Sequence, residues 1–128
     1  MGLAILVGLG ASFGAVARYL IDRAVTHRRE APFPAAPFPS GTWLINISGA
    51  FVLGLLVGLA GRHGLPAAAL AVTGTGICGG YTTFSTFSVE TIRLTEDGRA
   101  TLALMNMLTS IAAGLAAAAL GLGLAYAI

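Results

Sequence analysis

Hydroxyl and aromatic side chains cluster in one short stretch, GGYTTFSTFSVE at residues 79–90, inside an otherwise apolar part of the chain. Six of the ten residues from 82 to 91 carry a hydroxyl group. Hydroxyl donors and the positive ring edges of Phe84 and Phe87 can replace the water around a small anion without a full positive charge that would trap it. Because unpaired polar groups are costly in hydrocarbon, this insert predicts a site, and its chemistry predicts an ion path. Packing of the two rings in a helix interface is the competing interpretation.

Amide and hydroxyl side chains on two other apolar segments extend the predicted path. Asn46 lies near the start of the second apolar segment, and Asn106, Ser110 and Gly114 follow one another at four-residue spacing on the fourth. Residues four apart share one face of a helix. Asparagine in a membrane helix most often bonds to a neighbouring helix, so each residue also fits a structural role. Polar sites on three segments favour a path over any single structural bond.

Arg18 and Glu90 are the charged residues that lie deepest in the apolar sequence. Ionisable groups at membrane depth are functional candidates, but snorkelling to the interface is the simpler interpretation of Arg18. Glu90, one turn beyond Thr86, is equally suited to bond to the backbone or to a neighbouring helix. Neither metal-ligand spacing nor a nucleophile with its base is found in the sequence, so no enzyme is predicted. The GxGxxG pattern at 74–79 lacks the strand and helix of a nucleotide site.

The elements that must position these residues are membrane helices. The chain of 128 residues is 56% hydrophobic and only 9% charged, with a mean hydropathy of +0.87. A soluble domain is about a quarter charged, so the composition indicates an integral membrane protein with the lipid bilayer as its partner. A net charge of +2 is too small to suggest nucleic acid. Four apolar segments predict one all-α transmembrane domain over 1–128, with four transmembrane helices at about 3–21, 40–60, 65–94 and 101–128.

The third of these segments is too long for one straight helix. At about 1.5 Å per residue it would reach roughly 45 Å, against a hydrocarbon core of about 30 Å. We therefore predict a helix broken mid-membrane near 79–80, where freed carbonyls often form ion sites. Small residues at helix-packing spacing, such as Gly10 with Gly14 and Gly54 with Gly58, predict close helix contacts and, because four short helices cannot easily enclose a path alone, an oligomer.

The chain resembles the CrcB or Fluc family of small bacterial fluoride channels over nearly its full length. Four stretches of the sequence carry this resemblance. They are GASFGAVARY at 10–19, GTWLINISG at 41–49, GGYTTFSTFSVE at 79–90 and the segment 106–114, and the third is the most specific. The resemblance implies a passive fluoride-selective channel of the cell (inner) membrane that exports cytoplasmic fluoride and reduces its toxicity. It also implies an antiparallel, dual-topology homodimer with two pores and a structural sodium ion at its centre.

Roles for single residues follow from the same resemblance, by motif position. It makes Phe84 and Phe87 the pore phenylalanines and Asn46 a pore-lining donor, and it places Arg18 near the vestibule. The remaining assignments are Ser85, Thr86 and Ser110 for the rest of the polar track, Asn106 where many members have tyrosine, Gly114 where some have serine, Glu90 for the glutamate after the phenylalanines, and the backbone carbonyls of Gly79 and Thr82 for sodium.

Two other classes of membrane protein remain as alternatives. A proton-coupled exporter of the small multidrug type also has four short spans, but it depends on an acid deep in the first span, and residues 3–21 contain none. A structural membrane assembly protein would explain the small-residue pairs but leaves the polar insert without a purpose. Five arginines (Arg23, Arg28, Arg29, Arg93 and Arg99) fall on the predicted side opposite Arg62. By the positive-inside rule this bias favours one orientation, with both termini outside.

Overall fold

The computed structural model describes residues 1–27 and 38–128, and within these ranges every element is helical. The proline-rich segment between the first two helices lies largely outside them. The elements are α1 (Gly2–His27), α2 (Ser40–His63), α3 (Ala67–Leu70), the π-helical η1 (Ala71–Cys78), α4 (Gly79–Tyr81), α5 (Phe84–Glu96) and α6 (Ala100–Ala127). Within the described ranges, three helices are long and apolar enough to cross a membrane: α1 over Gly2–Val25, α2 and α6.

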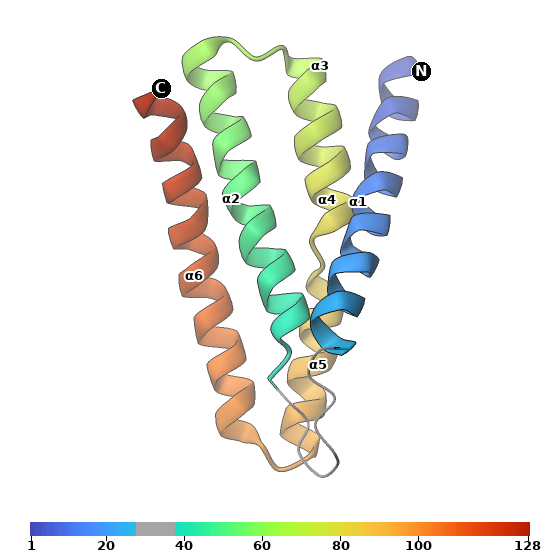
Figure 1. Ribbon diagram of the computed structural model, residues 1–128, viewed down its shortest axis with the longest axis vertical. Helices are drawn as coiled ribbons and strands as arrows, with labels where there is room; N and C mark the ends of the chain where they lie inside the picture. The colour runs from blue at the N-terminus through green and yellow to red at the C-terminus, as the bar shows by residue number, and fades with distance from the viewer. Residues whose placement is uncertain (28–37) are drawn as a thin grey trace.

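All the helices run roughly along the long axis of the molecule (Figure 1). Both chain termini lie at the end where α2 turns into α3, and the turn from α5 to α6 lies at the opposite end. Each turn uses a glycine in the left-handed region: Gly64 with φ of 69° ends α2, and Gly98 with φ of 74° lies between α5 and α6. Such a glycine is the usual way to end a helix.

Glycine lets neighbouring backbones touch in two places. A Cβ atom on Gly54 of α2 would collide with the Ala118 backbone of α6, and one on Gly121 would collide with the Phe51 carbonyl oxygen. On the other side of α2, Gly14 and Gly80 bring α1 against η1 and α4 in the same way. The close contacts predicted from the small-residue spacing are confirmed. They lie within one chain, so they give no support to the oligomer inferred from them.

The third apolar segment is interrupted, but not at the position predicted from the sequence. Gly79 is helical, with φ of −65° and ψ of −38°. The chain is extended at Thr82 (φ −78°, ψ 159°) and at Thr83 (φ −149°, ψ 121°), between α4 and α5. The prediction of a break near 79–80 was therefore wrong by two to three residues. Gly80 has a packing role instead, because a Cβ there would collide with the Ala11 carbonyl oxygen.

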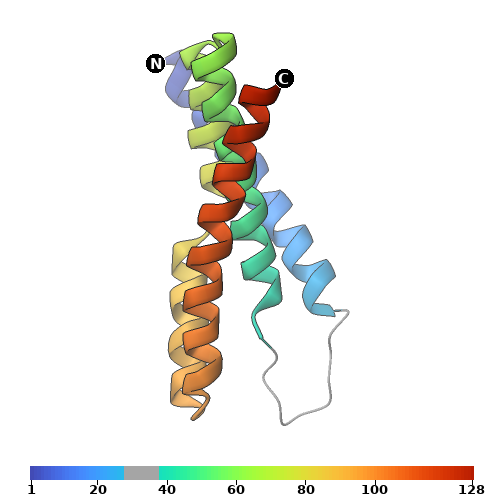
Figure 2. The ribbon, with the colours of Figure 1, turned by 90° about the vertical axis from the view of Figure 1, so that its left-hand side faces the viewer.

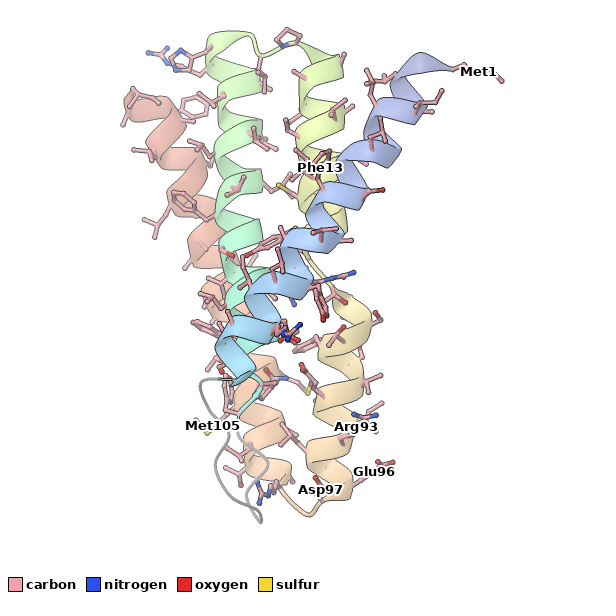
Figure 3. All side chains as sticks on the ribbon, turned by 45° about the vertical axis from the view of Figure 1, so that its right-hand side comes forward. Met1, Phe13, Arg93, Glu96, Asp97 and Met105 are labelled. Carbon is pink, nitrogen blue, oxygen red and sulfur yellow. The ribbon has the colours of Figure 1, made fainter. Side chains whose placement is uncertain are left out.

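The surface of the described part of the chain is largely apolar and its core is small. The buried apolar residues are Ile45, Cys78, Leu94, Ala103, Ala117 and Ala125, whereas large side chains such as Phe13 and Leu115 are about 70% exposed (73% and 69%). Charged side chains, among them Arg93, Glu96 and Asp97, gather at the end of α5 (Figure 3). An exposed apolar belt with charge at one end suits a bilayer as the surrounding solvent.

Candidate functional site

Thr83 organises the start of α5. Its hydroxyl accepts a hydrogen bond from the Thr86 backbone N–H at 3.2 Å, so Thr83 is the N-cap of the helix. The same hydroxyl lies 3.2 Å from the Ser85 hydroxyl and 3.0 Å from the Thr86 hydroxyl. Thr83 was not among the residues singled out in the sequence. Threonine is a preferred N-cap residue, and this preference would have identified Thr83 if the break had been placed correctly.

Asn46 on α2 binds the backbone of Thr83 from both sides. Its Nδ2 donates to the Thr83 carbonyl oxygen at 3.0 Å, and the Thr83 N–H donates to its Oδ1 at 2.8 Å. In a continuous helix the Thr83 N–H would donate to the carbonyl of Gly79, four residues earlier. Because that N–H is taken by Asn46, the Gly79 carbonyl loses its usual partner.

The segment of α2 next to Asn46 packs against the break between α4 and α5. A Cβ on Gly49 would collide with the Thr82 methyl group and crowd the Tyr81 ring, so only glycine leaves room there. One residue earlier, the Ser48 hydroxyl lies 2.9 Å from the Tyr81 hydroxyl, within hydrogen-bond distance. The residues Asn46, Ser48 and Gly49 of α2 thus each contact a different residue at the end of α4 or just after it.

A groove of about 560 Å³ runs along the break. Its walls bring together Asn46, Gly79, Thr82 and Phe84, four of the residues predicted for the site. Phe84 is 79% exposed, and its ring centroid lies 5.8 Å from that of Phe87, with an interplanar angle of 41°. The side chains of Ser85 and Thr86 are also exposed. Three of the four predicted pore residues of α5 therefore lie at the surface of the single chain, and the fourth, Phe87, is half-buried.

Arg18 lines a second, smaller cavity of about 260 Å³ together with Asp22, Thr42 and Thr86, and Glu90 bonds to one of these residues, Thr42. Arg18 Nη1 donates to the Thr82 carbonyl oxygen at 3.2 Å, so this guanidinium contacts the break rather than only reaching for the interface. The Thr42 hydroxyl donates to Glu90 Oε1 at 2.9 Å. The other oxygen, Oε2, is buried and has no hydrogen-bond partner among the described residues.

Asn106 and Ser110 lie between α5 and α6 and are not among the residues that line the groove. Asn106 is 1% exposed; its Nδ2 donates to the Thr91 hydroxyl at 2.9 Å, and its Oδ1 accepts from Ser110 at 3.5 Å. The Thr91 hydroxyl in turn donates to the Phe87 carbonyl oxygen at 2.7 Å. This relay connects α6 to the backbone of a predicted pore residue, and Thr91 is a second residue that the sequence did not single out.

Backbone oxygens are the ligands that this region offers to a metal ion. Among the described residues, no group of three or more histidine, cysteine, aspartate or glutamate side chains is placed to hold one. The Gly79 carbonyl lacks its helical partner and Gly79 is exposed, whereas the Thr82 carbonyl, beside the same groove, already accepts a hydrogen bond from Arg18 Nη1. Freed carbonyls at a helix break suit a hard monovalent cation such as sodium. The freed Gly79 carbonyl therefore fits the ion that the resemblance implies, and the Thr82 carbonyl would offer it the lone pair that Arg18 does not use.

Comparison with known proteins identifies similar chains over nearly the whole length. The family described as CrcB-like protein, Camphor Resistance (CrcB), matches residues 5–122. The chain is 44% identical over 129 residues to the fluoride-specific ion channel FluC 1 of Frankia casuarinae, which covers 97% of this chain and 96% of the relative. It is 44% identical to FluC 1 of Thermobifida fusca (93% and 92% covered) and 49% identical to FluC 2 of Mycobacterium tuberculosis (84% and 79% covered).

Proposed function

The chain belongs to the family of CrcB-like proteins, and on that premise we propose that it is a fluoride-specific ion channel. The observation that carries the proposal is its similarity to relatives of that name over 97% of this chain. It is a multi-pass membrane protein, and in bacteria such a protein lies in the inner membrane. The relatives are named ion channels, which are not enzymes. We propose further that it lets cytoplasmic fluoride leave the cell down its electrochemical gradient, which reduces fluoride toxicity.

The exposed groups at the start of α5 support a dehydration mechanism. Fluoride would exchange its water for hydroxyl donors of Ser85 and Thr86 and for the ring edges of Phe84 and Phe87. Asn46 would donate at the same level, since its Nδ2 carries a second hydrogen. Asn106 and Ser110 would complete the polar track on α6. None of these groups carries a full positive charge, so binding stays weak enough to release the ion.

We propose four membrane crossings in each subunit and an antiparallel homodimer. The third crossing would consist of α3, η1 and α4, then the break and α5. Both termini lie at one end of the molecule, which supports an even number of crossings (Figure 1). Phe84 is exposed and the groove beside it is open in one subunit, so a second subunit has an apolar surface to cover.

We also propose that the carbonyls of Gly79 and Thr82 hold a structural sodium ion. The support is the Gly79 carbonyl freed by the Asn46–Thr83 pair. A bound sodium ion would supply the positive charge that lets the Gly79 carbonyl oxygen remain without a hydrogen-bond donor at membrane depth.

Fluoride efflux from liposomes tests the channel proposal directly. Purified protein is reconstituted into vesicles loaded with fluoride, and release is followed with a fluoride electrode, with chloride release measured in parallel and protein-free vesicles as control. We expect rapid fluoride release that requires a charge-balancing ionophore, with chloride retained. Fluoride retained by vesicles that contain folded, dimeric protein would contradict the proposal.

A further inference from the structure

We propose that Asn46 is the positioning residue of the cation site, because its side-chain amide binds the Thr83 backbone and thereby keeps the Gly79 carbonyl free for sodium. This inference rests on the proposed sodium site and adds to it the residue that creates the site. Asn46 itself does not need to contact the ion.

The hydrogen bonds on either side of the break support this role. The Thr82 N–H donates to the Cys78 carbonyl at 2.9 Å, which is the normal helical bond. The next bond in that series would join Thr83 to Gly79, but the Thr83 N–H donates to Asn46 Oδ1 at 2.8 Å. Asn46 Nδ2 returns a bond to the Thr83 carbonyl at 3.0 Å. The side-chain amide thus offers Thr83 the same donor and acceptor that a neighbouring backbone would.

The burial of Thr83 makes the alternative costly. Thr83 is 8% exposed, and a buried N–H without an acceptor is strongly unfavourable. Without Asn46, the acceptor that helix geometry would offer to this N–H is the carbonyl of Gly79. We therefore expect α4 to extend by one hydrogen bond in a variant that lacks the amide. That bond would compete with a cation for the same carbonyl oxygen.

The position of Gly79 explains why the freed carbonyl is useful. Among the described residues, no atom outside the neighbouring backbone of its own helix lies within 4 Å of the place where a Cβ would be, and Gly79 shares the groove with Thr82 and Asn46. One side chain would therefore support both the cation site and the anion path. Fluoride flux alone cannot separate these two roles, so the test must measure the cation response.

Sodium titration of the purified, full-length protein provides that measurement. Thermal unfolding of the dimer is followed in sodium chloride and in N-methyl-D-glucamine chloride. In parallel, the Gly79 carbonyl is observed by NMR after labelling with ¹³C- and ¹⁵N-glycine. The pair Gly79–Gly80 is the only Gly–Gly sequence in the chain, so its carbonyl–nitrogen signal is unique.

Four variants separate the role of Asn46 from general damage to the α2 contact. Asn46→Leu and the smaller change Asn46→Ala remove the amide. Asn46→Asp keeps an acceptor for the Thr83 N–H, and Ser48→Ala removes the nearby Tyr81 contact from the same helix. We expect sodium to stabilise the parent and to shift its Gly79 carbonyl signal, with both responses kept in Asn46→Asp and Ser48→Ala. In Asn46→Leu or Asn46→Ala the half-effective sodium concentration should rise about tenfold, as expected for a competing hydrogen bond.

The results also distinguish this inference from the proposed sodium site. If Asn46→Leu or Asn46→Ala keeps the parent's sodium affinity while the Gly79 signal of the parent moves with sodium, the role of Asn46 is wrong and the cation site stands. If sodium stabilises the parent but the Gly79 signal does not move, the ion binds elsewhere, and both the role of Asn46 and the site at Gly79 and Thr82 are wrong. Loss of the response in Asn46→Asp would likewise overturn the role of Asn46, because the acceptor is still present. A parent that shows no sodium response refutes the cation site itself, whereas the fluoride assay remains an independent test of the channel.

Discussion

The hydroxyl groups around the break have two different roles in the structure. Those of Thr82, Ser88 and Thr91 donate to the backbone carbonyl four residues earlier, at 2.7 to 2.9 Å. Such bonds satisfy the side chain locally. The hydroxyls of Ser85 and Thr86 instead gather around Thr83, and both residues are exposed. A hydroxyl-rich sequence therefore overstates the number of donors that an ion can use, and Ser85 and Thr86 are the candidates on α5.

Replacing Phe84 tests the aromatic part of the mechanism. We expect Phe84→Ile to lower fluoride efflux by up to about tenfold, because it removes the ring edge while the side chain remains apolar. Phe84 is 79% exposed in the subunit, so the subunit fold should survive. Phe13→Ile on α1 is the matched control, since that ring is 73% exposed and distant in sequence from the predicted pore. Equal efflux rates for the two folded, dimeric variants would contradict a role for the ring, and Phe87→Ile provides the second test.

The Asn106–Thr91 relay predicts a stability effect at the contact between α5 and α6. Thr91→Val leaves the Nδ2 of a side chain that is 1% exposed without its partner, which should destabilise the protein by about 1 kcal/mol. Thr95→Val, one turn further along α5, removes only a local bond to the Thr91 carbonyl and should be nearly neutral. Denaturant unfolding in detergent measures both changes. The double variant Thr91→Val with Asn106→Leu should recover part of the stability that Thr91→Val loses. If it does not, the unpaired Asn106 amide is not the cause of the destabilisation.

At the scale of whole elements, hydropathy predicts which segments are helical but not where each begins and ends. The first helix continues past 21 to His27, and the third segment becomes helical at Ala67 and ends at Glu96. The excess length of the third segment led to the prediction of a break, and the structure contains one. Its position was wrong because Gly80 was interpreted as flexible, whereas it is needed for contact with Ala11. Only the three-dimensional packing separates these two uses of glycine.

The site was predictable to the extent that its residues share one sequence motif. The stretch at residues 79–90 contains Phe84, Ser85 and Thr86, and these three residues lie together in the structure. The partners that position the break come from α1 and α2, and their pairing with it is a long-range property: Asn46 with Thr83, Arg18 with Thr82. No local pattern in a single sequence specifies which backbone atom a distant amide or guanidinium will bind. Asn46 was therefore predicted as a pore donor, and its bonds to Thr83 were not foreseen.

Close backbone contact between α2 and α6 predicts a sharp difference between two glycines of α6. Gly121→Ala would place a methyl group against the Phe51 carbonyl oxygen, and overpacking of this kind costs about 1–3 kcal/mol. Gly123→Ala, two residues later, meets no atom of another described helix within 4 Å of its new methyl group and should be close to neutral. Unfolding of the two variants in detergent compares them directly. Similar stability for both would show that α2 and α6 do not approach as closely as described.

At the scale of the molecule, one subunit lacks a surface that closes around an ion. Figure 2 shows α5 beside the first half of α6, with the lower ends of α1 and α2 diverging from them. Phe84 is exposed at the groove, and the buried core is small. A second subunit is the simplest way to enclose the polar side chains of α5. The antiparallel arrangement that we propose would also place the same break from each subunit at one level of the membrane.

The distribution of arginine makes orientation the most demanding test of that arrangement. Arg23, Arg93 and Arg99 lie towards one end of the described molecule and Arg62 towards the other, which by the positive-inside rule favours a single orientation. An antiparallel dimer requires both orientations. Ala67→Cys and Ala100→Cys, each in a Cys78→Ala background, introduce single exposed thiols at opposite ends of the molecule, at the starts of α3 and α6.

Labelling of intact cells with a membrane-impermeant maleimide then counts the chains in each orientation. Dual topology predicts that about half of the chains react at either position, because each end faces outward in half of the population. Full reaction at one position and none at the other would show a single orientation. In that case the arginine bias determines insertion, the antiparallel homodimer is wrong, and two chains that point the same way must enclose the path.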